Sequence, residues 1–328
     1  MKVSSALLSL SITNGQRNLL RGLFVLIAVG LGYAQSVSAA ADPVVGVVYP
    51  NVRDPYQGIF STITDGIESE LNSTSKHFII DSDNPVVFRD WINREHIELV
   101  IALGKRSQQL IERSSVNLPV IYGALVAASN DETRYGPGIL LTPSPATLFT
   151  HLLDYAPGTQ SVLVVYNTKH DQWLIDQARE AARALGLDLR ALAAGSIQAA
   201  AQIWYQAIVN HGEERYAIWL LNDHTVVDSR AILPMILKES WERKIIAFSS
   251  NPSTVKRGVL FSLYPDNYNM GRSLGRLALQ RLRSPDYPVI LMPTEDVLAA
   301  FNTRTAEHLG IVVADEKMKD ISLTFPGN

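Results

Sequence analysis

The 328-residue sequence contains no cysteine, which excludes disulfides, thiol nucleophiles and thiolate metal sites. It also excludes a lipid anchor at a processed N-terminus, because that attachment requires a cysteine thiol. Charged residues are sparse, at 19%. The net charge is −3, and the sequence has no long run of charges of one sign. We therefore expect no nucleic-acid partner. Hydrophobic residues reach 47%, and a chain of this length suits two domains with substantial cores.

The N-terminal segment differs in character from the rest of the chain. Arg17 and Arg21 precede a short apolar run over residues 22–31, and small residues follow up to Ala41. This is the pattern of a secretory signal. We expect a signal peptide over residues 1–41, cleaved after one of its last three alanines, and a periplasmic mature protein. An uncleaved membrane anchor is the alternative, although the run is short for a bilayer span.

After the signal, short apolar runs alternate with amphipathic stretches at helical spacing. This alternation predicts an α/β fold with parallel sheets covered on both faces. Two such series surround a stretch rich in Gly, Pro, Ser and Thr at 129–145, which we interpret as a crossing between two doubly wound lobes. The expected strands are 44–48, 78–80, 99–103, 119–122, 161–166, 188–193, 216–221 and 245–248. The expected helices are 57–72, 86–94, 107–113, 146–155, 171–185, 197–210 and 229–243.

The late segment from Arg257 to Arg272 reads RGVLFSLYPDNYNMGR. It resembles a motif of the ABC-transporter substrate-binding family that includes tryptophan-binding lipoproteins, and weaker matches follow in the same order along nearly all of the mature chain. The resemblance implies a type I periplasmic-binding-protein architecture in which the chain crosses a hinge three times. It places one lobe at 42–141 plus 265–290 and the other at 142–264 plus 291–328.

Departures from this family prevent a transfer of its ligand. Relatives usually carry small hydroxyl residues after the third strand, where this chain has Gly104, Lys105 and Arg106. These two cations precede a helix and could receive a carboxylate or phosphate; a solvated loop is the alternative.

Ligands of doubly wound sheets sit beyond the carboxyl ends of the strands. Tyrosines at such ends would supply flat walls with hydroxyl groups, and short polar side chains would hydrogen-bond the ligand. Ordinary half-buried aromatics, turns and helix caps are the structural alternatives. The expected ligand-binding residues are Tyr49, Gly104, Tyr122, Tyr166, Asn222, Asp223, Ser250, Tyr264 and Asp266.

One motif suggests an enzyme and is rejected. Gly271, Ser273 and Gly275 match the nucleophile elbow G-x-S-x-G, but the elbow requires its serine at a sharp turn directly after a strand. Here the two glycines lie four apart on an expected helix, where they would let it pack closely against a neighbour. The histidines show no metal-ligand spacing, and no phosphate loop appears. We expect no catalysis, no metal and no cofactor.

These observations predict an extracytoplasmic protein that captures a small polar or aromatic ligand between two lobes. We expect a monomer that delivers the ligand to an ABC permease. The alternative is a periplasmic ligand-sensing partner of a membrane receptor or signalling protein, without transport. A cytoplasmic sugar-regulator type shares the implied fold, but the export signal and the missing helix-turn-helix argue against it.

Overall fold

The computed structural model describes residues 43–126, 136–210, 215–285 and 290–327. The expected signal peptide and its cleavage site fall outside these residues. Among the described residues, no helix is both long enough and apolar enough to cross a membrane.

The first lobe is built on a six-stranded sheet in the order β11-β5-β4-β3-β1-β2. All of its pairs are parallel, as the near-continuous apolar strands predict. The strands are β1 (Val45–Pro50), β2 (Lys76–Ile80), β3 (Leu99–Leu103), β4 (Val120–Leu125), β5 (Gly138–Pro143) and β11 (Leu291–Thr294). The helices are α2 (Tyr56–Leu71), α3 (Pro85–Glu95), α4 (Lys105–Ser114) and α10 (Asn267–Arg283).

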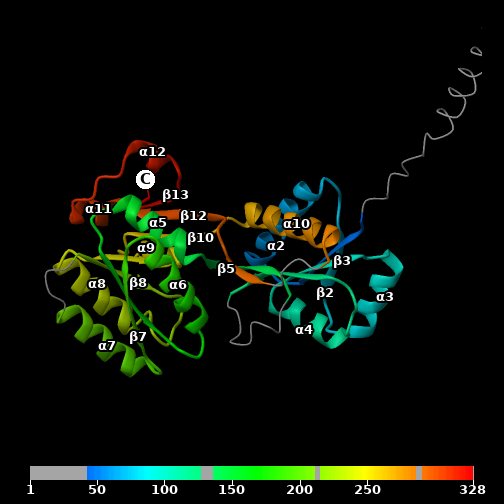
Figure 1. Cartoon of the computed structure of the whole chain (residues 1–328), viewed down its shortest axis with the longest axis horizontal. Helices are drawn as coiled ribbons and strands as arrows, with labels where there is room; N and C mark the ends of the chain where they lie inside the picture. Colours follow the sequence, from blue (N-terminus) through cyan, green and yellow to red (C-terminus); the bar gives the residue numbers. More distant parts are fainter. Residues whose placement is uncertain (1–42, 127–135, 211–214, 286–289, 328) are drawn as a thin grey trace, which may run out of the picture. The chain divides into compact units, whose positions relative to one another are not determined.

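Helices cover both faces of this sheet, with α2 and α10 on one face and α3 and α4 on the other (Figure 1). The alternation of side chains along each strand explains the two cores. In β3, Leu99 and Ile101 pack with α2 and α10, whereas Val100 and Ala102 join the opposite core. Every residue of β3 is therefore buried.

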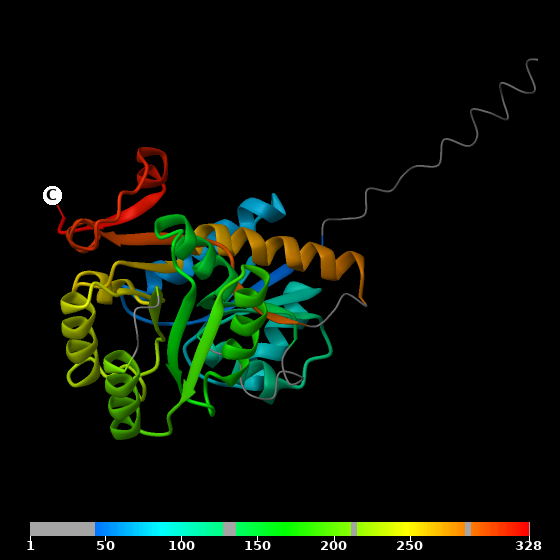
Figure 2. The same cartoon turned by 60° about the vertical axis from the view of Figure 1, so that its left-hand side comes forward.

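The helices α2 and α10 lie side by side although about 200 residues separate them (Figure 1; Figure 2). Glycines make this approach possible. A Cβ atom on Gly66 would collide with the carbonyl oxygen of Tyr268, and one on Gly271 with that of Ile63. Ser273 lies within α10 and not at a strand-to-helix turn, so this motif does not form a nucleophile elbow. The close helix packing predicted for its glycines is confirmed.

The second lobe contains a seven-stranded sheet in the order β13-β12-β10-β9-β8-β6-β7, in which only the β10–β12 pair is antiparallel. Its strands are β6 (Ser161–Tyr166), β7 (Asp188–Ala193), β8 (Tyr216–Leu220), β9 (Ile246–Ser249), β10 (Phe261–Pro265), β12 (Val297–Asn302) and β13 (Ile321–Phe325). Its helices are α5 (Pro145–Tyr155), α6 (Gln172–Ala184), α7 (Ile197–Val209), α8 (Ile232–Glu242), α9 (Pro252–Val255), α11 (Thr303–Leu309) and α12 (Asp315–Lys319).

The chain passes between the two sheets three times, after β5, after β10 and after β11. Two backbone hydrogen bonds tie these crossings together: Ser144 donates to Thr294 over 2.8 Å, and Asp266 donates to Asp296 over 3.0 Å. The structure differs here from the sequence-based boundaries. Residues 138–143 form a strand within the segment expected to be only a crossing, and residues 291–294 join the first sheet, not the second lobe.

Candidate functional site

Polar residues gather beyond the carboxyl ends of β6, β8 and β9 in the second lobe. Asn167 follows β6 directly, Asn222 and Asp223 follow β8, and Ser250 follows β9. Because these three strands are neighbours in the sheet, their ends form one continuous edge. This is the edge at which doubly wound sheets bind ligands.

Asn167 joins two loops of this edge. Its side chain is buried, and its Nδ2 donates to the hydroxyl of Thr225 over 3.1 Å. Its Oδ1 accepts from the backbone N–H of Lys169 over 3.0 Å. The loops after β6 and β8 are therefore held together by side-chain hydrogen bonds, which gives the edge a defined shape.

A pair of carboxyl groups, Asp171 and Asp223, lies beneath these loops. Asp171 occupies the N-cap position of α6 but caps nothing; its Oδ2 accepts from the backbone N–H of Asn167 over 3.1 Å. Asp223 Oδ1 accepts from both the N–H and the hydroxyl of Thr225. The buried Oδ2 of Asp223 has no donor in the described chain apart from a proton held on Asp171.

Burial is the main influence on the pKa of Asp171. It raises the pKa of Asp171 to about 6, and the charge of Asp223 acts in the same direction. The N–H of Asn167 and the nearby His170 oppose the rise in pKa without overcoming it. Asp171 therefore keeps its proton in mildly acidic solution, in which an ordinary aspartate has lost it.

Two side chains at this edge remain available to a ligand. Asn222 is exposed, and its Oδ1 accepts only a 3.3 Å hydrogen bond from Asn251. The Oγ of Ser250 is buried and has no partner among the described residues. A buried hydroxyl without a partner costs stability, so this group gains from a ligand that hydrogen-bonds to it.

In the first lobe, aromatic side chains lie near the carboxyl end of β1. The ring of Tyr49 stacks on Phe60 of α2 with centroids 6.0 Å apart, and it meets His77 edge-on. Burial raises the pKa of Tyr49, and the charge of Glu68 adds to the effect. A Cβ on Gly104 would lie 3.4 Å from the Phe60 ring, so the glycine leaves that ring uncovered by a side chain at this position.

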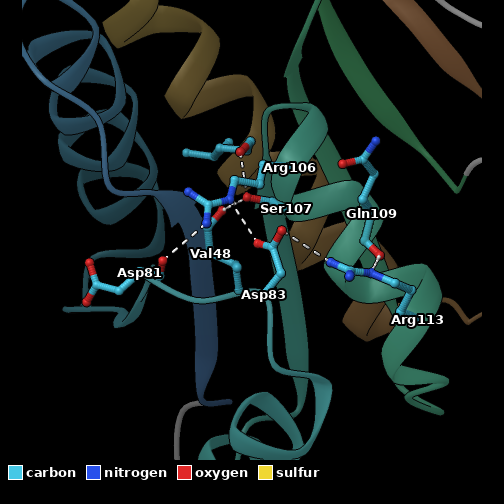
Figure 3. Close-up of polar contacts among 8 residues, drawn as sticks. Val48, Asp81, Asp83, Arg106, Ser107, Gln109 and Arg113 are labelled. Carbon is cyan, nitrogen blue, oxygen red and sulfur yellow. Dashed lines mark hydrogen bonds and ion pairs between the residues drawn. The ribbon is translucent and has the colours of Figure 1, made fainter.

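Lys105 and Arg106, which follow β3, are not equally available to a ligand. Arg106 Nε pairs with Asp83 at 2.8 Å, and its Nη2 donates to the carbonyl of Asp81 (Figure 3). Asp83 also pairs with Arg113 at 3.5 Å. The charge of Arg106 is thus already balanced by a neighbouring loop, and only Lys105 stays exposed without a described partner.

Several predicted site residues have structural roles in the molecule. The expectation that a strand ends at Tyr122 is wrong, because β4 continues to Leu125 and Tyr122 is buried within it. Tyr166 does end β6, but it is buried and its hydroxyl donates to Gln172 over 3.3 Å. Tyr264 shares a hydrogen bond with Ser322 on β13.

Asp266 caps α10, and each of its carboxylate oxygens accepts a hydrogen bond from Asn269. One carboxylate oxygen accepts from the N–H of Asn269 over 3.1 Å, and the other accepts from the Asn269 side chain over 2.7 Å. Three residues of the edges were not foreseen from the sequence, namely Asn167, Asp171 and Phe60. Asn167 directly follows β6, so the rule that ligands bind beyond the carboxyl ends of the strands could have identified it.

A family model described as "ABC transporter substrate binding protein" matches residues 81–321. Among solved structures, the ligand-free, open structure of a substrate binding protein with adhesive properties from Clostridium difficile aligns with a TM-score of 0.60 and 16% identity, covering 87% of this chain and 100% of that one. An ABC domain in complex with L-Trp from Streptococcus pneumonia aligns with a TM-score of 0.48 and 18% identity, covering 87% and 100%. No curated protein matches the sequence. The Clostridium likeness shows the fold, which is of the type I periplasmic-binding-protein kind.

Proposed function

Because the chain belongs to the family of ABC transporter substrate binding proteins, we propose that it captures a small polar or aromatic solute outside the cytoplasmic membrane and delivers it to an ABC permease. The solute sits between the two lobes, and closure of the lobes is a hinge motion about the three crossings. The protein acts as a monomer and as a binding protein, not as a catalyst.

The observation that carries this proposal is the set of unsatisfied polar groups at the carboxyl edge of the second sheet. Ser250 Oγ is buried without a partner in the part of the chain that the structure describes, and Asn222 beside it is exposed. Protein interiors rarely keep a polar atom unpaired, so such an atom at a ligand-binding edge is best explained by a partner that arrives with the solute.

The first lobe supplies the apolar part of the recognition. Tyr49 and Phe60 form a stacked pair at the carboxyl edge of β1, next to Gly104. Aromatic rings offer flat surfaces on which an apolar or aromatic portion of a solute packs. The combination of polar groups on one lobe and rings on the other selects solutes that carry both characters.

The location follows from the N-terminal segment. We propose that residues 1–41 act as a signal peptide and are removed during export to the periplasm. Because the sequence contains no cysteine, we propose that the mature protein carries no lipid at its N-terminus.

A two-stage experiment tests the proposal. A thermal-shift screen of amino acids and other small polar or aromatic solutes first identifies a ligand, since a solute at 100 times its Kd adds about 2.7 kcal/mol of stability. Affinities are then measured calorimetrically for Asn222→Ala and Ser250→Ala. Each should bind the solute about ten- to hundredfold more weakly, because a polar group of the solute loses its partner.

Ser161→Ala is the matched control. Ser161 also has a buried hydroxyl without a described partner, but it lies at the amino end of β6, on the opposite edge of the sheet. Its replacement should leave the affinity unchanged. If Asn222→Ala and Ser250→Ala both bind the solute as tightly as the wild type, the candidate functional site is misplaced.

A further inference from the structure

A pocket of about 610 Å³ opens on the second lobe, away from the candidate functional site. It is formed by the end of α8, the segment before β10, the end of β12 and the residues that follow β13. Because β12 runs antiparallel to β10, Phe301 pairs with Phe261 and the end of β12 lies at the start of β10. The pocket therefore faces the amino ends of β9 and β10, whereas the candidate functional site lies at the carboxyl ends of β6, β8 and β9.

Three cations line this pocket: Lys256, Arg257 and Arg304. Within the ranges that the structure describes, no ion pair joins any of them to a carboxylate. Arg257 donates only to the backbone carbonyl of Ser229, over 2.8 Å. Arg243 at the nearby end of α8, by contrast, is paired with Glu239 at 3.1 Å. Like charges that converge without a counter-charge are unfavourable, and an anion relieves that repulsion.

The wall of the pocket is held in place before any ligand arrives. Trp241 stacks on His308 with centroids 3.6 Å apart and rings 3° from parallel, and His308 Nε2 lies 2.9 Å from the Trp241 carbonyl. Arg304 lies over the same indole, 6.0 Å from its centroid. The two helices that carry these residues, α8 and α11, are adjacent in both views (Figure 1; Figure 2). Arg304 is thus positioned before an anion binds, and it loses little freedom on binding.

A narrow recess continues from this pocket into the lobe. It shares Trp241, Gly258 and Thr305 with the pocket, and it is also lined by Ser240. The Ser240 side chain is only 5% exposed, and its hydroxyl has no partner among the described residues. A helical serine ordinarily satisfies itself by donating to the carbonyl four residues back. Here it does not, and the recess of about 10 Å³ leaves room for no more than a water molecule beside this hydroxyl.

From these contacts we infer that the pocket is a second binding site, for a small molecule that carries a phosphate or carboxylate group. The oxyanion is held by Lys256, Arg257 and Arg304 through charge-assisted hydrogen bonds. The site is independent of the proposed solute site, since it lies at the opposite ends of the strands and needs residues of the second lobe only.

Titration calorimetry on the full chain tests this inference with inorganic pyrophosphate and with citrate, at constant ionic strength. At least one of these probes should give saturable heat, and the stronger of the two shows whether phosphate or carboxylate is preferred. Arg304→Gln should weaken that binding about ten- to hundredfold, the loss expected for one charge-assisted hydrogen bond. Arg183→Gln, which removes an exposed charge at the end of α6, should bind the probe as the wild type does.

A second variant separates binding from folding. Ser240→Ala removes a hydroxyl that has no described partner and lies in a recess too small for either probe, so the melting temperature of the empty protein should be unchanged or higher and the probe should bind as it does to the wild type. The inference is overturned if neither probe gives saturable heat, or if Arg183→Gln loses as much affinity as Arg304→Gln.

Discussion

Replacement of Asp171 by asparagine should stabilise the protein at neutral pH. Asp171 and Asp223 lie close together and are partly buried, and burial raises the pKa of Asp171 to about 6 from an ordinary value of 3.8. An asparagine keeps an oxygen that accepts the 3.1 Å hydrogen bond from Asn167, and its amide can donate to the unpaired Oδ2 of Asp223. The variant therefore imitates the protonated carboxyl group without its titration.

The size of the effect follows from the two pKa values. Below about pH 4 the folded and unfolded chains both hold the Asp171 proton, so the site does not affect stability. Between about pH 4 and 6 the folded chain keeps the proton while the unfolded chain loses it, and stability falls as the pH rises. Above pH 6 the wild type carries the full cost, about 3 kcal/mol for a difference of about two pKa units.

Urea unfolding between pH 4 and 8 measures this difference. We expect the free energy of unfolding of Asp171→Asn to match the wild type near pH 4 and to exceed it by up to about 3 kcal/mol at pH 7.5. The control is Asp176→Asn on the same helix, whose side chain is 59% exposed and which should follow the wild-type pH profile. Parallel curves for Asp171→Asn and the wild type across the whole range would refute the reasoning.

Three further predictions concern packing, capping and export. Gly271→Ala should lower the free energy of unfolding by about 3 kcal/mol or more, because the new Cβ meets the Ile63 carbonyl; Gly58→Ala, with open space around it, should be neutral or slightly stabilising in the same thermal melts. Asp266→Ala should cost about 1 kcal/mol through loss of the α10 cap, whereas Asp266→Asn should retain most of that stability in urea unfolding. N-terminal sequencing of the periplasmic protein should begin at residues 40–42, and intact Met1 in the membrane pellet would contradict cleavage.

Most strands and helices could be predicted from the sequence because their hydrophobic patterns are strong. The strands β3, β6 and β7 begin and end where the apolar runs do. The strand β5 was missed because Gly138, Thr142 and Pro143 resemble a loop, yet pairing with β4 and β11 stabilises this segment as a strand. Such non-local pairing leaves no periodic trace in one sequence.

The candidate site was less predictable. The rule that ligands bind beyond the carboxyl ends of the strands predicts which residues lie at that edge, but not where their side chains point. Ser250 and Asn222 lie at the edge as expected, whereas Asp266 has turned its carboxylate to its own helix. The choice between a cap and a ligand contact depends on local hydrogen bonds that composition does not reveal. The Asp171–Asp223 pair depends on the approach of two loops separated by 52 residues, so only the folded chain shows it.

The close contact between α2 and α10 has a consequence for how the protein is made. The first lobe begins near residue 45 but receives α10 and its edge strand β11 only after the whole of β6 to β10 has been synthesised. Until α10 has been synthesised, α2 lacks the helix that packs against it through its glycines. Proteins dominated by such distant contacts fold slowly. A chain that completes its first lobe last stays incompletely folded for longer, and an incompletely folded chain is the form that the export proposed above requires.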